Sequence, residues 1–148
     1  MGFLGGEAST EIEAPIDVVW EIVEDVASAP DWQHGLDSMK PLEHDAEGRV
    51  LVADSTTDAK VRSVTTRVRF SYEPQRRVEW RQEKGDLKSL VGAWELEDLG
   101  GRTKATYRLD GDPGRMLGML IRGPVEDRLR EILVGGRPAE FKARVESG

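Results

Sequence analysis

The feature that most constrains this chain is a long stretch in which apolar and polar residues alternate between short turn sequences. In its longest run, residues 62–72, the even positions from 64 onward carry Val, Thr, Val, Phe and Tyr, while the odd ones carry Ser, Thr or Arg. Successive side chains of a strand point to opposite faces, so this run predicts a strand with one covered and one solvated face. Gly, Pro and Asp mark turns expected at 45–48, 73–76, 84–86 and 99–101, which indicates an antiparallel sheet built from hairpins.

Six strands follow from this pattern, and a seventh precedes them. The first is a short edge strand in which Ala8, Thr10 and Ile12 alternate with polar residues. The predicted strands are residues 7–13, 38–44, 49–54, 62–72, 77–83, 87–97 and 102–109.

Helical regions are expected on both sides of this pattern. A first helix begins near Pro15, and a shorter helical turn follows between Ser28 and Gly35. A long helix is predicted after the last strand, kinked at Gly123-Pro124, interrupted again at 135–138 and continued over 139–145. Its apolar stripe is formed by Met116, Met119, Leu120, Leu129, Ile132 and Leu133.

This order of elements predicts an α+β fold in one domain over residues 1–148, with the helices gathered on one face of the antiparallel sheet. A sheet of this length must curve. A curved sheet closed by one long helix encloses a space, and whether that space is filled or hollow decides the function.

Composition excludes several classes of protein. The 148 residues include 28 acidic and 21 basic side chains, for a net charge of -7, and no cysteine. Disulfide scaffolds, thiolate zinc sites, thiol redox chemistry and cysteine nucleophiles are therefore excluded. No apolar stretch is long enough to span a bilayer, and the N-terminus lacks the pattern of a secretory signal. We expect a soluble, cytoplasmic protein without stable membrane insertion.

Charge is distributed unevenly along the chain. Residues 60–88 hold four acidic and nine basic side chains, a net charge of +5, whereas residues 1–59 sum to -12. The basic residues alternate with apolar ones, as on the solvated face of a strand, and the acidic pI of 5.0 argues against a nucleic-acid partner.

Residues suited to catalysis are few. His34 and His44 are the side chains that titrate near neutral pH, and both are expected at the surface. With Asp31, Asp37 or Asp45 they match no recognised metal-ligand spacing, so neither a metal site nor another cofactor is predicted. No serine lies in a nucleophile elbow, and no glycine-rich loop has the phosphate-binding context. Catalytic residues therefore stay unassigned.

Several stretches of the chain are similar to a known family. They are 13–20 (EAPIDVVW), 30–32 (PDW), 72–78 (YEPQRRV), 92–96 (GAWEL) leading through 100–103 (GGRT) to 105–107 (ATY), 123–125 (GPV) and 141–146 (FKARVE). In this order they resemble the polyketide cyclase/dehydrase and lipid-transport family of the START-like superfamily, also called SRPBCC proteins. The resemblance covers nearly the whole chain. It implies a helix-grip fold, in which a curved seven-stranded antiparallel sheet wraps around a long C-terminal helix.

The resemblance also implies a hydrophobic cavity between sheet and helix. Strand parity independently places a set of large aromatic side chains on the covered face, where a ligand cavity would use them. Methionines on the kinked helix suit varied apolar ligands, and the kink itself suggests a lid. The predicted ligand-binding residues are Trp32, Phe70, Tyr72, Trp80, Trp94, Tyr107, Met116, Met119 and Leu120.

Three functions remain open at this point. The first is binding or carriage of a hydrophobic small molecule, such as a lipid, a quinone or a polyketide. The second is cyclisation and dehydration of a polyketide in the same cavity, as aromatase/cyclase members of the resembled family perform. The third is an interaction module that uses the basic segment 60–88. An apolar cavity favours carriage, and an inward Arg or Tyr favours chemistry.

Overall fold

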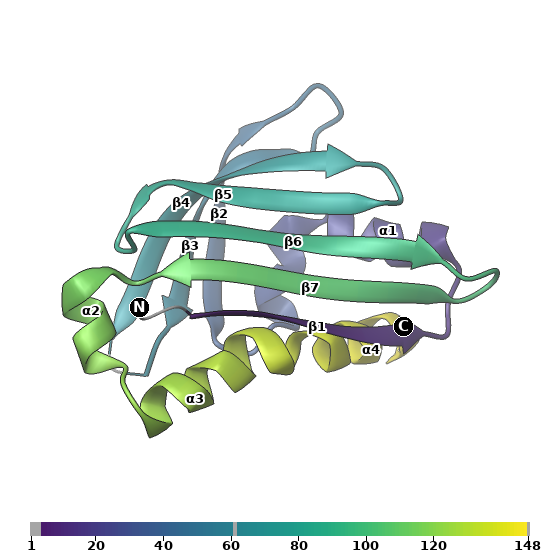
Figure 1. Cartoon of the computed structure of the whole chain (residues 1–148). Coiled ribbons are helices and arrows are strands. Elements are labelled where there is room, and N and C mark those ends of the chain that lie inside the picture. Colours follow the sequence, from purple (N-terminus) through teal and green to yellow (C-terminus); the bar gives the residue numbers. More distant parts are fainter. Residues whose placement is uncertain (1–3, 61, 148) are drawn as a thin grey trace.

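The protein is described by a computed structural model that covers residues 4–60 and 62–147. Seven antiparallel strands form one sheet in the order β1-β7-β6-β5-β4-β3-β2, which bends around the helical elements (Figure 1). The strands are β1 (Leu4–Ile12), β2 (Leu36–His44), β3 (Val50–Asp58), β4 (Ser63–Glu73), β5 (Arg77–Gly85), β6 (Ser89–Asp98) and β7 (Thr103–Asp112).

Hairpins connect β2 through β7 in sequence, and the first strand then pairs with the last. The β1–β7 register runs from Leu4 opposite Gly111 to Ile12 opposite Thr103. This long-range pairing brings the N-terminal strand beside the C-terminal helices, as Figure 1 shows. The helical elements are α1 (Ile16–Glu24), the 3₁₀ helix η1 (Val26–Asp31), α2 (Gly114–Leu120), α3 (Pro124–Arg130), the π-helical turn η2 (Glu131–Gly135) and α4 (Arg137–Ser147).

The alternation predicted for the strands is confirmed. In β4 the even positions Val64, Thr66, Val68 and Phe70 are buried, while the odd positions between them are exposed or half-buried. In β7, Thr103, Ala105 and Tyr107 are buried in the same way. The covered face is concave and meets the helices, and the other face carries charged side chains. The predicted α+β helix-grip fold is therefore observed.

The C-terminal helical region differs from its prediction. The expected kink is a complete break between α2 and α3, where Gly123 adopts a φ of 66°, a left-handed conformation that favours glycine. The second interruption predicted at 135–138 is observed at its first two residues. Helix α3 ends at Arg130, the π-helical turn η2 ends at Gly135, and Gly136 lies between η2 and α4. Gly136 keeps helical dihedral angles, so α4 follows η2 directly.

The apolar stripe predicted on this region is wrong in its first part. Met116, Met119 and Leu120 are 83%, 60% and 57% exposed. The face of α2 that packs on the protein instead carries Leu117, and Ile121 follows it one turn later; both are buried. Apolar residues occupy every side of α2, so the spacing alone did not show which side is covered.

The close approach of β5 and β6 depends on a glycine. Gly92 lies opposite Trp80, and a Cβ at position 92 would lie 2.4 Å from two atoms of the Trp80 indole. No real Cβ contact is that short, so only glycine lets the Trp80 ring lie flat against β6.

We expect Gly92→Ala to displace Trp80 and to lower the free energy of unfolding by roughly 1–3 kcal/mol, as overpacking does. Gly118→Ala is the matched control, because its Cβ would meet only Pro113 at 3.6 Å inside a helix. That control should stabilise the protein by up to about 1 kcal/mol. Urea unfolding of both variants measures the difference, and equal midpoints would contradict the steric role of Gly92.

Candidate ligand cavity

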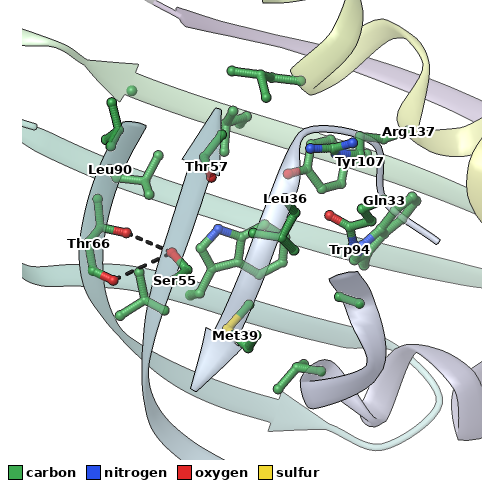
Figure 2. A pocket seen from close by; sticks show the side chains of 18 of the residues that line it. Gln33, Leu36, Met39, Ser55, Thr57, Thr66, Leu90, Trp94, Tyr107 and Arg137 are labelled. Atoms are coloured by element: carbon green, nitrogen blue, oxygen red, sulfur yellow. Dashed lines mark hydrogen bonds between the residues drawn. The ribbon is translucent and has the colours of Figure 1, made fainter. Parts of the chain in front are cut away.

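A cavity of about 130 Å³ lies between the concave face of the sheet and the helical elements. Strands β2 to β7 supply most of its wall (Figure 2). The segment from the end of α1 through η1 and the loop after it supplies a second part, and single side chains from α2, η2 and α4 complete the wall. A cavity of about 150 Å³ in another protein binds benzene. The space therefore matches one ring or a short aliphatic segment as it stands.

Aromatic rings form a continuous wall along one side of the cavity. The ring centroid of Trp94 lies 4.7 Å from that of Tyr107 and 4.7 Å from that of Phe141, which supports Trp94 without lining the cavity itself. Trp80 extends the series, with its centroid 5.7 Å from that of Tyr107 and 6.3 Å from that of Phe70. These separations fall in the range of favourable ring pairs, so each ring holds its neighbour in place. The wall is thus largely formed before a ligand arrives.

One side chain in this apolar wall carries a charge. Arg137, the first residue of α4, is only 3% exposed and lines the cavity. Its Nη1 donates to the carbonyl oxygen of His34 over 2.6 Å and to Oε1 of Glu140 over 2.9 Å. The second carboxylate oxygen of Glu140 accepts the backbone N–H of His34 over 2.8 Å. This Arg137–Glu140–His34 network fastens the loop after η1 to α4.

The Nε atom of Arg137 is buried and has no partner within the described part of the chain. Figure 2 shows the Arg137 side chain beside Tyr107 at one end of the cavity. Burial raises the pKa of the Tyr107 hydroxyl, and the Arg137 guanidinium opposes that rise in part. The hydroxyl is therefore neutral at physiological pH and can donate a proton in a hydrogen bond.

A second polar pair lies on the sheet wall. The buried hydroxyls of Ser55 and Thr66 are 3.0 Å apart and hydrogen-bond to each other across β3 and β4 (Figure 2). The indole Nε1 of Trp32, another cavity residue, is buried without a partner among the described residues. The cavity is thus apolar over most of its surface, with hydrogen-bonding groups at separate points.

Of the nine predicted ligand-binding residues, five line the cavity and four do not. Those that line it are Trp32, Phe70, Trp80, Trp94 and Tyr107. Met116, Met119 and Leu120 point outward on α2, where Leu117 contributes to the wall instead. The ligand-binding role of the five remains a prediction.

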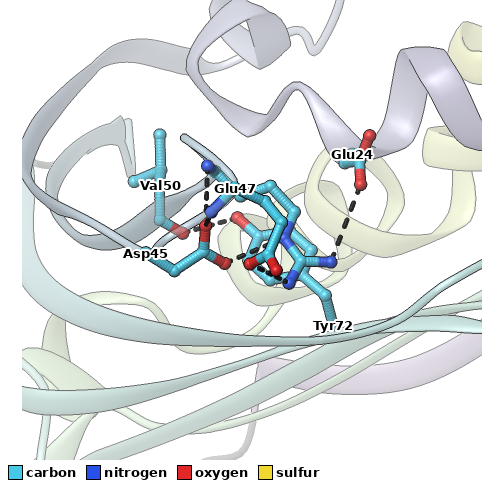
Figure 3. Close-up of polar contacts among 6 residues, drawn as sticks. Glu24, Asp45, Glu47, Val50 and Tyr72 are labelled. Carbon is cyan, nitrogen blue, oxygen red and sulfur yellow. Dashed lines mark hydrogen bonds and ion pairs between the residues drawn. The ribbon is translucent and has the colours of Figure 1, made fainter.

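Tyr72 lies on the covered face of β4, as predicted, but it does not line the cavity, because it is next to the C-terminal end of the strand. Its hydroxyl donates to the carbonyl oxygen of Val50 over 2.6 Å, and the Arg49 guanidinium stacks 4.7 Å from its ring centroid (Figure 3). Arg49 in turn pairs with Asp45, Glu47 and Glu24. Burial, followed by the Asp45 charge, raises the pKa of Tyr72 far above its ordinary value. The Tyr72 side chain therefore packs against the start of β3 and not against the cavity.

Sequence reasoning missed Arg137. It stands in a Gly-Gly-Arg-Pro segment whose composition predicts a helix interruption, and a charged residue is expected at the surface by default. The usable signal was its spacing: Arg137 lies three residues before Glu140 and four before the buried Phe141, on the covered side of α4.

The remaining candidates from the sequence lie outside the cavity. His34 and His44 are both exposed, and only the backbone of His34 takes part in the Arg137 network. Within residues 4–60 and 62–147, no group of three or more His, Asp or Glu side chains is arranged to hold a metal ion. In the same residues no helix is long and apolar enough to cross a membrane.

The comparison with protein families decides the family of the chain. The family described as "Polyketide cyclase / dehydrase and lipid transport" matches residues 12–134. The chain belongs to this family. A search of the curated proteins returns no match.

Solved structures agree on the fold of this polyketide cyclase/dehydrase family member. A START superfamily protein from Mycobacterium smegmatis superposes with a TM-score of 0.80 at 17% identity, covering 97% of both chains. The Zhui aromatase/cyclase from a Streptomyces species gives a TM-score of 0.73 at 23% identity, covering 97% of this chain and 94% of that one. A major latex-like protein from Panax ginseng gives 0.66 at 14% identity, over 97% and 98% of the two chains. Such low identities establish the fold and leave the ligand open.

We expect Glu140→Ala to destabilise the protein by about 3 kcal/mol, because it leaves the Arg137 charge buried without its carboxylate. The double variant Arg137→Met/Glu140→Ala should recover part of that loss. Glu83→Ala is the matched control, since Glu83 pairs with Arg69 on the solvated face and both side chains are at least 40% exposed. Urea unfolding of the four proteins gives the values, and a loss for Glu140→Ala no larger than that for Glu83→Ala would contradict the buried pair.

Proposed function

We propose that the protein binds a hydrophobic small molecule in this cavity, with an oxygen atom of the molecule facing Arg137. The observation that carries the proposal is an apolar cavity whose wall contains a buried arginine with a free donor, Nε. Membership of a family that binds hydrophobic ligands or cyclises polyketides supports it.

The charge balance around Arg137 indicates which chemical group of the ligand carries the oxygen atom. Glu140 already neutralises the guanidinium, at 2.9 Å, so the pair contributes no net charge to the cavity. A carboxylate ligand would therefore bring an uncompensated charge into an apolar space, at a high desolvation cost. A neutral carbonyl, as in a quinone or a polyketide ketone, accepts the Nε–H bond without that cost. We infer that ketones and quinones bind more tightly than matched carboxylic acids.

The size of the cavity restricts the rest of the molecule. At about 130 Å³ it lies below the range of roughly 300–1,000 Å³ typical of sites for drug-sized ligands. One ring fits without rearrangement. A lipid chain or a longer polyketide requires a wall element to move.

Native mass spectrometry of the purified protein, followed by organic extraction, tests whether a molecule co-purifies. The protein is then titrated with single-ring quinones and aromatic ketones while its tryptophan fluorescence is measured. This readout is suited to the cavity because three of the four tryptophans, Trp32, Trp80 and Trp94, line it. An unliganded protein that also fails to respond to the whole ketone and quinone series would overturn the proposal.

We expect Trp80→Ala and Trp94→Ala to weaken binding of such a ring compound by about tenfold or more, because each removes a large part of the aromatic wall. Arg67→Ala is one control, since Arg67 pairs with Asp54 at 2.8 Å on the outer face. Tyr72→Phe is a second, and should cost about 1 kcal/mol of stability while leaving affinity unchanged. Isothermal titration calorimetry measures the affinities, and equal weakening in all four variants would refute the assignment of the faces.

The pairing of Arg137 with Tyr107 favours a second candidate function, cyclisation and dehydration of a poly-β-ketone. Arg137 is suited to polarise a ketone by hydrogen bonding to its oxygen. An enol carbon of the same chain then attacks the carbonyl carbon, the alkoxide formed takes a proton from neutral Tyr107, and the proton released from the enol oxygen restores the Tyr107 hydroxyl. Loss of the new hydroxyl together with a hydrogen from the adjacent carbon, as water, gives a cyclic enone, and its enolisation completes an aromatic ring.

We expect Arg137→Met to lower such turnover roughly 100-fold or more, as loss of an oxyanion donor does, and Tyr107→Phe to lower it less. Mass spectrometry of a poly-β-keto thioester incubated with the protein detects the product, which is lighter by one water. The Arg137→Met/Glu140→Gln variant is the control for stability, because it removes the Glu140 charge that Arg137→Met alone leaves unpaired. It should lose turnover to the same extent as Arg137→Met. Binding without turnover in the wild-type protein would leave carriage as the function and exclude this second one.

A further inference from the structure

Helix α2 presents an apolar surface to solvent. Met116, Met119 and Leu120 are 83%, 60% and 57% exposed. Residues spaced three and four apart share one side of a helix, so these three side chains form a single patch.

The opposite side of the same helix is also apolar. Leu117 is 6% exposed, and Ile121, just after the helix, is fully buried; both pack with Ala59, Leu129 and Leu133. The only charged residue in α2 is Arg115. A helix that is apolar on every side is normally buried on every side. In this protein the inner side of α2 is buried against the fold, whereas its outer side is exposed to solvent.

This concentration of apolar surface is peculiar to α2. Among the described residues, the other exposed large hydrophobic side chains are Val18 and Leu42, each 41% exposed. They lie singly, on α1 and on β2. Single exposed apolar residues are normal on soluble proteins, whereas a contiguous patch indicates a binding surface.

Basic residues flank the patch in a protein whose net charge is -7. Arg115 precedes Met116, Arg122 follows Ile121, and Lys88 lies beside Gly114 at the start of the helix. None of the three cations has a carboxylate partner in the described part of the chain. An apolar patch between unpaired cations is complementary to an anionic lipid surface, where phosphates lie above acyl chains.

We propose that α2 docks on the surface of anionic lipid bilayers, with Met116, Met119 and Leu120 in the upper acyl region and Arg115 and Arg122 at the headgroups. The contact is peripheral and involves no spanning segment. Leu117 on the inner side of α2 lines the cavity, so docking brings the cavity wall against the bilayer. Exchange of an apolar ligand between the cavity and the bilayer rests on the proposed binding function, whereas docking itself does not.

The test is co-sedimentation of the full chain with vesicles of phosphatidylglycerol and phosphatidylcholine, and with vesicles of phosphatidylcholine alone. We expect binding to the anionic vesicles that weakens with salt, and little binding to the neutral ones. Met116→Ser/Met119→Ser should lower the partition coefficient about tenfold or more. Arg115→Gln and Arg122→Gln should each lower it about fivefold. Leu42→Ser is the matched control, an exposed apolar residue elsewhere, and should bind as the wild-type protein does.

Three outcomes overturn the proposal: no preference for anionic vesicles, equal binding by the Met116→Ser/Met119→Ser variant, or an equal loss with Leu42→Ser. A dimer in size-exclusion chromatography that the methionine variant dissociates also overturns it, because a second copy of the chain then covers α2. Ligand binding by tryptophan fluorescence is measured without vesicles, so failure of docking and failure of the proposed function are separable.

Discussion

The architecture of the site depends on the contact of three rings, Trp32, Trp94 and Phe141. The Trp32 and Phe141 rings stack with centroids 5.2 Å apart, and the Trp94 centroid lies 4.7 Å from that of Phe141. The three residues come from the end of η1, from the middle of β6 and from α4. One aromatic contact therefore ties the helix, the loop and the sheet together. Fully buried Phe141 is the residue common to the two close pairs.

The position of Arg137 follows from this contact. Arg137 lies one helical turn before Phe141, so anchoring the phenyl ring directs the guanidinium to the same side of α4. A buried arginine is costly unless it is paired, and the protein supplies the Glu140 carboxylate and the His34 carbonyl within 2.9 Å. Its Nε atom is buried and has no protein acceptor among the described residues. The scaffold thus holds the charge in place and leaves the Nε–H available to the ligand proposed above.

The sheet was predictable from the sequence because the alternation of side chains encodes both the strands and their faces. Strand parity places Phe70, Trp80, Trp94 and Tyr107 on the covered face, and all four line the cavity that the family resemblance implies there. Parity gives the face but not the position along the strand, which is why Tyr72 was included although it lies at a hairpin end against Val50. The seven-residue helix α2 carries apolar residues on every side, so its sequence has no polar face that would show which side is exposed. The local spacing to Glu140 and Phe141 indicates the covered side of α4, but the bond from Arg137 to the His34 carbonyl, 103 positions away, is a tertiary contact that no local pattern contains.

The same contrast between sheet and helix indicates which part of the cavity wall separates most easily. Each strand that forms the cavity wall is held by ladder hydrogen bonds on both sides or by a hairpin, and Gly92 locks Trp80 against β6. Helix α2 has only Leu117 within its length as a buried anchor. Glycines with φ of 82° and 66°, Gly114 and Gly123, lie at its two ends, where the backbone changes direction. Separating α2 from the sheet breaks few contacts and no ladder bonds, whereas opening the sheet breaks many. For the ligand binding proposed above, a molecule longer than one ring is therefore expected to enter beside α2, by displacing Leu117 from the wall.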